Sequence, residues 1–375
     1  MANRIPLTHI VAISATSLLA ALIAPRTHAD QPLGWISSGN DAAYTLGRNE
    51  VELSLAGLLI NDTLDFLDVR EDLLKSNDNL TGDTGDLTGT RFELQYGLTS
   101  WLTLFYQRQQ HDLTVQLGEI SSAQIEDLDD ALSTTRQEYG IKWTIYQGRL
   151  LNGNNHRRTA TLQLSGFDAE SDDFGVVISE LYFPNLTIRF RDPQTFSVTQ
   201  LEDKGWTAKL LLSLPLTNAM VATFWGGYSD SEATSATTSD LTAQPVASYF
   251  EQSFRLDESF FRAGASLNWQ LRPRLPISLS YEFIKRHDNH FTATPTTPPV
   301  QLPGFLRSRA SPEDSNHTLT ARASWWLTPH THISLTGNLY SNQFLGILPH
   351  YNNPLSGSFS DNPYGFAGLQ LGFRF

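Results

Sequence analysis

The sequence predicts an all-β fold, in which antiparallel strands run up and down and close into a barrel that crosses a membrane. Three observations carry this prediction. Apolar and polar residues alternate over segments of about 9 to 11 residues, the length that crosses a bilayer at a tilt. The connections between these segments alternate between tight turns and long stretches. The last segment also alternates and ends in an aromatic residue, Phe375.

Composition removes several classes of protein. The 375 residues include no cysteine, which excludes a disulfide framework, a thiolate metal site and a cysteine nucleophile. The formal net charge of −13 argues against a nucleic-acid partner, because binding phosphate requires a basic surface. Beyond the N-terminus no apolar run is long enough for a transmembrane helix, whereas barrel strands escape such a search because they alternate.

The N-terminal residues 1–29 have the organisation of a secretory signal peptide. Arg4 supplies the charged start, residues 10–24 are apolar, and the small residues Thr27 and Ala29 precede a cleavage point before Asp30. A membrane-anchoring helix fits less well, since the apolar run is short and is followed by proline. We therefore expect the mature chain to be exported.

The alternating segments number twelve, and an even number returns both ends of the barrel to one side of the membrane. They cover residues 50–59, 90–98, 101–111, 137–146, 158–167, 205–214, 219–229, 260–271, 276–286, 315–326, 331–341 and 363–375. Fourteen strands are the alternative, because residues 174–183 and 186–191 could form another hairpin. We favour placing this hairpin within a long loop, since its first arm carries three consecutive apolar residues from Val176.

Tight turns and strand-end aromatics distinguish a membrane barrel from a soluble sandwich, whose strands also alternate. The tight turns are expected at residues 98–101, 215–218, 272–276 and 328–330. Aromatic residues are expected beside these turns and again at the opposite strand ends, as two interfacial girdles. The two sets are Trp101, Tyr146, Trp269 and Trp326, and Tyr106, Trp206, Tyr228 and Phe261.

The final segment, residues 367–375, carries Leu371, Phe373 and Phe375 on one face. A last amphipathic strand that ends in Phe resembles the C-terminal signature of Gram-negative outer-membrane β-barrel proteins. The signal peptide and the alternation extend this resemblance to porin-like transport channels over the mature chain. It implies that the short turns are periplasmic, that the long loops face outward, and that the barrel assembly machinery reads the terminal residues.

Three parts of the chain follow from this resemblance. Residues 1–29 are the signal peptide, residues 30–49 a periplasmic tail or a stub folded into the lumen, and residues 50–375 the barrel. Outer-membrane lipid and lipopolysaccharide are the expected surroundings. The acidic outer loops, residues 60–89 and 112–136, are interpreted as solvated surface, with cation bridging to lipopolysaccharide as the less favoured alternative.

On the face opposite the leucines and aromatics, the strands carry charged and polar residues that would line a water-filled lumen. Basic Lys142, Lys209 and Arg322 are predicted near the middle of the wall, with Glu93 and Glu282 at similar levels. The remaining lumen candidates are Arg91, Glu138 and Arg262. A locally basic constriction predicts a weak preference for anions or carboxylates, and the alternative is a ladder of ion pairs without selectivity.

The third outer loop is unusually apolar, with Phe174, Tyr182, Phe183 and Phe190 among its residues. It could pack on itself or serve as a capture surface for hydrophobic compounds.

The polar lumen predicts passive uptake of small solutes as the function, and the apolar loop makes uptake of hydrocarbons or aromatics an alternative. An outer-membrane lipase or protease is a weaker alternative, since short Ser/His/Asn and Asp/His matches occur by chance. We predict no catalytic residues, no metal site and no cofactor.

Overall fold

The computed structural model of the protein describes residues 42–60, 84–115, 123–128, 131–148, 157–183, 186–240, 252–294, 315–340, 343–344, 351–352 and 364–375. The predicted signal peptide, residues 1–29, lies outside the described residues. Within the described ranges, no helix is long and apolar enough to cross a membrane.

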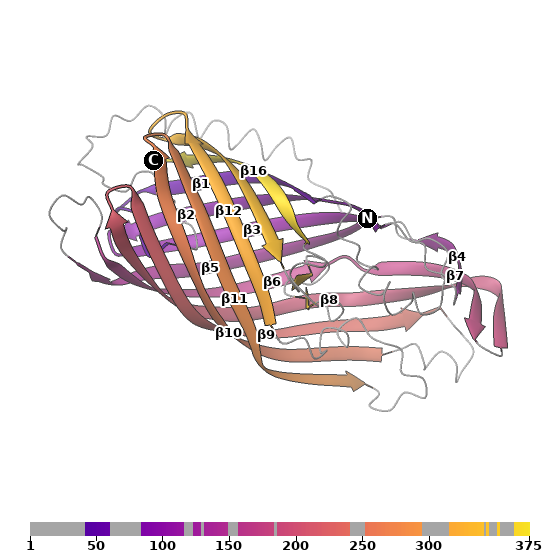
Figure 1. The fold of residues 1–375 in the computed structure, drawn as a ribbon. Helices are drawn as coiled ribbons and strands as arrows, with labels where there is room; N and C mark the ends of the chain where they lie inside the picture. Colours follow the sequence, from indigo (N-terminus) through magenta and orange to yellow (C-terminus); the bar gives the residue numbers. More distant parts are fainter. Residues whose placement is uncertain are drawn as a thin grey trace.

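Twelve of the described strands pair with their neighbours around a closed ring, and every pairing is antiparallel (Figure 1). The ring contains β1 (Val51–Ile60), β2 (Thr84–Thr99), β3 (Leu102–Val115), β5 (Ala131–Gln147), β6 (Thr159–Ser171), β8 (Leu186–Thr217), β9 (Met220–Ser239), β10 (Gln252–Arg272), β11 (Leu275–Thr294), β12 (Ser315–Trp326), β13 (Thr331–Tyr340) and β16 (Tyr364–Arg374). Pairing of β1 with β16 and of β8 with β9 completes the ring. The predicted barrel of twelve strands is confirmed.

Tight turns join strands at the end of the barrel that we take as periplasmic. The pairs Thr99–Leu102, Thr217–Met220 and Arg272–Leu275 each close a hairpin, and residues 327–330 connect β12 to β13. These turns lie where the sequence predicted them. Short turns gathered at one end are the pattern of single-chain outer-membrane barrels.

The wall is apolar outside and polar inside, the reverse of a soluble protein. Along β1, Leu55 and Leu59 are exposed while Glu52 and Ser54 are buried. Leucine, isoleucine and aromatic side chains make up the exposed large apolar residues of the other strands as well, whereas many serine, threonine, asparagine and glutamine side chains are buried. Since strand residues alternate between faces, this inversion gives the barrel a lipid-facing belt and a polar lumen.

Aromatic side chains form part of the predicted outer girdle. Trp206, Tyr228 and Phe261 lie on three adjacent strands, with ring centroids 5.6 Å apart in each neighbouring pair. At the other end the prediction was wrong at one position: Trp326 points inward, and its ring contacts that of His332 at a tilt of 40°, with centroids 4.6 Å apart. Its neighbour Trp325 is 62% exposed and faces outward instead, because adjacent strand residues occupy opposite faces.

Strands β8 to β11 are about twice as long or longer than a membrane crossing requires. We call the ends of these strands that lie farthest from the tight turns their upper parts. They extend beyond the girdle of Trp206, Tyr228 and Phe261 and lie toward the lower right of Figure 1. β7 (Phe174–Phe183) pairs with the upper part of β8, and the short β4 (Ala123–Leu128) pairs with β7. A further small sheet joins β14 (Gln343–Phe344) and β15 (Tyr351–Asn352).

The predicted hairpin of the third outer loop is therefore part of a longer two-stranded ribbon, formed by β7 and the part of β8 that pairs with it. Glu170 pairs with Glu202 in the barrel wall, and Phe174 pairs with Val198 in the same register above it. The second arm of the hairpin is continuous with barrel strand β8, so the hairpin adds no strand to the ring. This supports the choice of twelve over fourteen.

The last residue closes the seam between the two ends of the barrel. The backbone N–H of Phe375 donates to the carbonyl of Val51 at 2.9 Å, and the N–H of Val51 donates back at 3.0 Å. The Phe375 ring lies nearly parallel to that of Phe373, with centroids 6.4 Å apart. Phe375 therefore contributes both to pairing and to the outer aromatic surface.

Deleting Phe375 is expected to lower the yield of folded barrel, because it removes two backbone hydrogen bonds and the terminal ring from the closing seam. The measurement is the fraction of protein in outer membranes that migrates as a compact, heat-modifiable band. Phe375→Tyr, which keeps the ring and the backbone, is the control. Equal yields for the deletion and the wild type would contradict the role of this residue.

Candidate functional site in the barrel lumen

The first described residues, 42–46, lie inside the barrel. Ala42, Ala43, Tyr44 and Leu46 are buried, and Ala43 packs against the inward-facing side chains of Leu211 and Trp225. Arg48 and Asn49, which lead into β1, are exposed, and the N–H of Asn49 donates to the carbonyl of Gly97 beside a tight turn. We call residues 42–49 the luminal segment.

Wall hydroxyl groups hold the backbone of the luminal segment. The N–H groups of Ala43 and Leu46 donate to Ser213 Oγ at 3.1 Å and Thr103 Oγ1 at 2.9 Å. Thr161 donates to the carbonyl of Ala43. Because residues from β3, β6 and β8 take part, the segment is fixed to one side of the wall.

Tyr44 anchors the segment near the periplasmic end. Its hydroxyl donates to the carbonyl of Arg157 at 3.2 Å, in the connection between β5 and β6. Burial raises the pKa of the Tyr44 hydroxyl, so the group remains a neutral donor.

Lys142, predicted as a selectivity residue, lies beneath this segment. Its side chain is 1% exposed, and Nζ donates to the carbonyl of Ala42 at 3.3 Å. The predicted selectivity role required this ammonium group to face the path, whereas the luminal segment separates it from the remaining space.

A cavity of about 230 Å³ lies beside the luminal segment and contacts Ala42. Its lining comes from β2, β3, β5 and β10 to β13, whereas the segment contacts β2, β3, β5, β6, β8 and β9, so that only the cavity reaches β10 to β13. The polar lining residues are Arg91, Glu93, Gln95, Gln107, Glu138, Asn268, Ser278, Thr320, Arg322, Ser324, Thr336 and Asn338. The segment and the cavity thus occupy largely different sides of the lumen.

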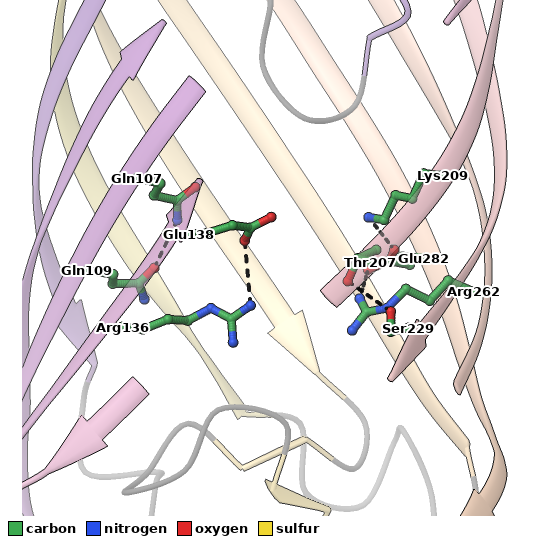
Figure 2. A network of polar contacts seen from close by, with 9 residues as sticks. All are labelled: Gln107, Gln109, Arg136, Glu138, Thr207, Lys209, Ser229, Arg262 and Glu282. Carbon is green, nitrogen blue, oxygen red and sulfur yellow. Dashed lines mark hydrogen bonds and ion pairs between the residues drawn. The ribbon is translucent and has the colours of Figure 1, made fainter. Parts of the chain in front are cut away.

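Glu282 joins two of the predicted basic residues. It lies 3.0 Å from Lys209 Nζ and 3.5 Å from Arg262 Nη1, and it accepts a hydrogen bond from Trp225 Nε1 at 3.4 Å. Arg262 Nε also donates to Ser229 Oγ at 2.7 Å. Figure 2 shows this group on one side of the lumen, with Glu282 between Lys209 and Arg262.

A second group lies on the other side of the lumen in Figure 2. Arg136 pairs with Glu138 at 3.5 Å, and its guanidinium lies 4.0 Å from the centre of the Phe167 ring. Arg136 was missed as a lumen residue because the predicted strand began one residue later. β5 begins at Ala131, and the same alternation that marks Glu138 extends to Arg136.

Glu93 forms a third group at the cavity. It lies 3.5 Å from Arg91 Nε and accepts from Ser54 at 3.0 Å and from Gln370 at 3.5 Å. Arg322 lines the same cavity and attracts Glu93 through space, without an ion pair between them. Apart from Lys142 and Arg322, the predicted lumen residues therefore belong to separate ion-paired groups along the wall.

Inward-facing aromatic rings lie flat over glycines of the neighbouring strands. Trp225 faces Gly264, and Phe105 faces Gly140. A Cβ atom on Gly264 would lie 2.2 Å from the Trp225 ring, so glycine is required for this close approach. These glycines keep large rings against the wall and preserve luminal space.

Gly264→Val is expected to destabilise the barrel by about 1–3 kcal/mol, because the new side chain must displace Trp225. The midpoint of urea unfolding, followed by tryptophan fluorescence in detergent micelles, measures the effect. The matched control is Gly57→Val, since a Cβ at Gly57 meets nothing within 4 Å. Similar losses in both variants would show that the Trp225 contact is not the cause.

Several other sequence predictions concern groups outside the lumen. Among the apolar loop residues, Phe174, Tyr182 and Phe183 belong to β7, and the Phe190 ring lies 6.3 Å from that of Phe196 on β8. His317, the histidine of the Ser/His/Asn match formed with Ser315 and Asn316, contacts Tyr281 Oη at 2.7 Å through Nδ1 on the outer face. Among the described residues, no group of three or more His, Asp or Glu side chains could hold a metal ion.

Similarity to known proteins lies in the fold. Neither a protein-family model nor a curated protein matches this sequence. The translocator domain of autotransporter NalP from Neisseria meningitidis is 9% identical, with 97% of each chain covered and a TM-score of 0.50. The NanC porin is 7% identical, covering 86% of this chain and 98% of its own, with a TM-score of 0.41. The toluene transporter TodX from P. putida is 8% identical, covering 92% of each chain, with a TM-score of 0.42.

At these identities the comparisons show a common fold only. The closed ring of twelve described strands, the apolar outer belt and the polar, ionised lumen define the chain as an outer-membrane β-barrel protein. Its location is therefore the outer membrane.

Proposed function

We propose that this barrel is a channel for passive passage of small polar solutes across the outer membrane. The observation that carries the proposal is the polar cavity of about 230 Å³ inside a closed wall, beside the luminal segment. A barrel that served only as a structural anchor would need no charged cavity. Charged side chains in a membrane-spanning protein are costly unless they face water or one another, so such a lining favours a role in solute passage.

The luminal segment makes this channel narrow. It covers Lys142 and part of the wall from β5 to β9, which leaves the side from β10 to β13 as the proposed path. A preference for small solutes follows, because a partly filled twelve-stranded barrel has little space beyond its side chains.

A weak preference for anions or carboxylate-bearing solutes is part of the proposal. Lys209 and Arg262 share Glu282, and Lys142 is covered, so these three cations contribute little field to the path. Arg322, in the cavity itself, is the basic residue best placed to influence a permeating anion.

Uptake of hydrophobic compounds remains the second candidate. The apolar residues of β7 and β8 motivate it, but polar residues outnumber apolar ones such as Phe105 and Ile277 in the cavity lining. A channel for hydrocarbons would need apolar side chains around its constriction. The lumen therefore favours polar solutes.

The decisive experiment is conductance of the purified mature protein across a planar lipid bilayer. We expect small, stepwise openings in potassium chloride, with a reversal potential that indicates weak anion selectivity. Heat-modifiable protein from the same preparation verifies folding. If folded protein inserted into the bilayer without conducting and hydrolysed lipid or peptide, the proposed channel function would be wrong and an enzymatic function would be favoured.

A further inference from the structure

Four adjacent strands place polar side chains at one level of the cavity. Direct cross-strand pairs connect Asn268 of β10 to Ser278 of β11, Ser278 to Arg322 of β12, and Arg322 to Thr336 of β13. All four residues line the cavity. Because directly paired residues point to the same face of a sheet, their side chains form one row across the lumen wall. We call these residues the Arg322 row.

The polar groups of the Arg322 row are available for a ligand. Thr336 is 2% exposed, yet its hydroxyl has no hydrogen-bond partner among the described residues. Among the residues that the structure describes, none forms a hydrogen bond or an ion pair with the side chains of Asn268, Ser278 or Arg322. Buried polar groups are normally satisfied, so an unused hydroxyl that faces a cavity indicates a partner from outside the chain.

Charge around the cavity selects the kind of partner. The two carboxylates in the lining each have an arginine of their own, since Glu93 pairs with Arg91 and Glu138 pairs with Arg136. Arg322 remains as a cation without an ion-pair partner among the described residues. A guanidinium presents a planar set of donors that matches a carboxylate in bidentate geometry.

From this arrangement we propose that the Arg322 row is a binding site for small hydroxylated monocarboxylates. The carboxylate pairs with Arg322 and accepts from Thr336 on one side of it, and its neighbouring hydroxyl exchanges hydrogen bonds with Ser278 on the other side. The site rests on the proposed function, for which it names the solute class. Binding at one row, which itself holds a single cation, allows the solute to leave as readily as it enters, as passage requires.

The test measures binding directly, without conduction. Saturation-transfer NMR in detergent micelles compares lactate with lactamide, which has similar size and no charge. We expect lactate to bind the wild-type protein and lactamide to bind roughly tenfold more weakly, since charge-assisted hydrogen bonds are lost. Arg322→Gln should weaken lactate binding by a similar factor, and Arg322→Lys should retain part of it because the charge remains.

Arg189→Gln is the matched control, because it removes an arginine that is 77% exposed on the ribbon outside the lumen. Lactate binding should be unchanged in this variant, and all variants should remain heat-modifiable. Lactate that binds Arg322→Gln as tightly as the wild type, or that fails to bind the wild type, would overturn the proposed site. Lactate binding that requires Arg322, in a protein that does not conduct, would support the site and refute the channel.

Discussion

Deleting residues 30–46 is expected to raise single-channel conductance severalfold. The deletion removes the buried part of the luminal segment, residues 42–46, and uncovers Lys142, whose Nζ then faces solution. A wider path with a newly accessible cation should also move the reversal potential toward anion selectivity. The measurement is single-channel recording in planar bilayers with a potassium chloride gradient.

A cross-linked variant provides the control. Because the sequence contains no cysteine, only the two introduced residues can form a disulfide. Ala43→Cys with Ser213→Cys would join the luminal segment to β8 at a place where Ala43 N–H already bonds the wall. Oxidised protein should keep the small wild-type conductance. If deletion left conductance unchanged, the segment would not limit the path. A higher conductance for the reduced than for the oxidised pair would show that the segment also moves.

Glu282→Gln is expected to destabilise the barrel by about 3 kcal/mol, because two cations lose their common carboxylate inside the lumen. Lys209 and Arg262 would then carry uncompensated charge, and the reversal potential should shift toward anions. Urea unfolding in detergent micelles measures the first effect, and bilayer recording measures the second.

Glu180→Gln is the control for Glu282→Gln. Glu180 pairs with Arg189 at 3.0 Å, but that arginine is largely exposed on the ribbon, so the loss should stay below about 1 kcal/mol. Restoring stability with Lys209→Met in the Glu282→Gln background would identify the unpaired ammonium as the cause. Equal destabilisation by both glutamine variants would argue against the luminal ion group.

Alternation, together with the tight turns and the terminal aromatic residue, predicted the fold class, the favoured number of strands and the lipid-facing side of most strand residues, Trp326 being an exception. Leu55 and Glu52 could be assigned to opposite faces because strand residues have a period of two. The tight turns were equally local, since a hairpin closes over a few residues. Strand lengths in the upper barrel were underestimated, because above the membrane both faces meet water and the alternation fades. Arg136 was missed because the predicted strand began at residue 137, although the alternation that marks Glu138 extends to it.

The state of the lumen was decided by tertiary structure. The sequence placed Lys142, Lys209 and Arg322 at similar heights, and nothing in their own strands distinguishes them. Their surroundings come from elsewhere in the chain: the carbonyl of Ala42 for Lys142, Glu282 for Lys209, and an open cavity for Arg322. Hydrophobic patterning acts through neighbours in sequence, whereas ion pairing across a barrel depends on strand register and on the luminal segment. Sequence therefore determined the wall, and only the closed barrel decided which of its charges face the path.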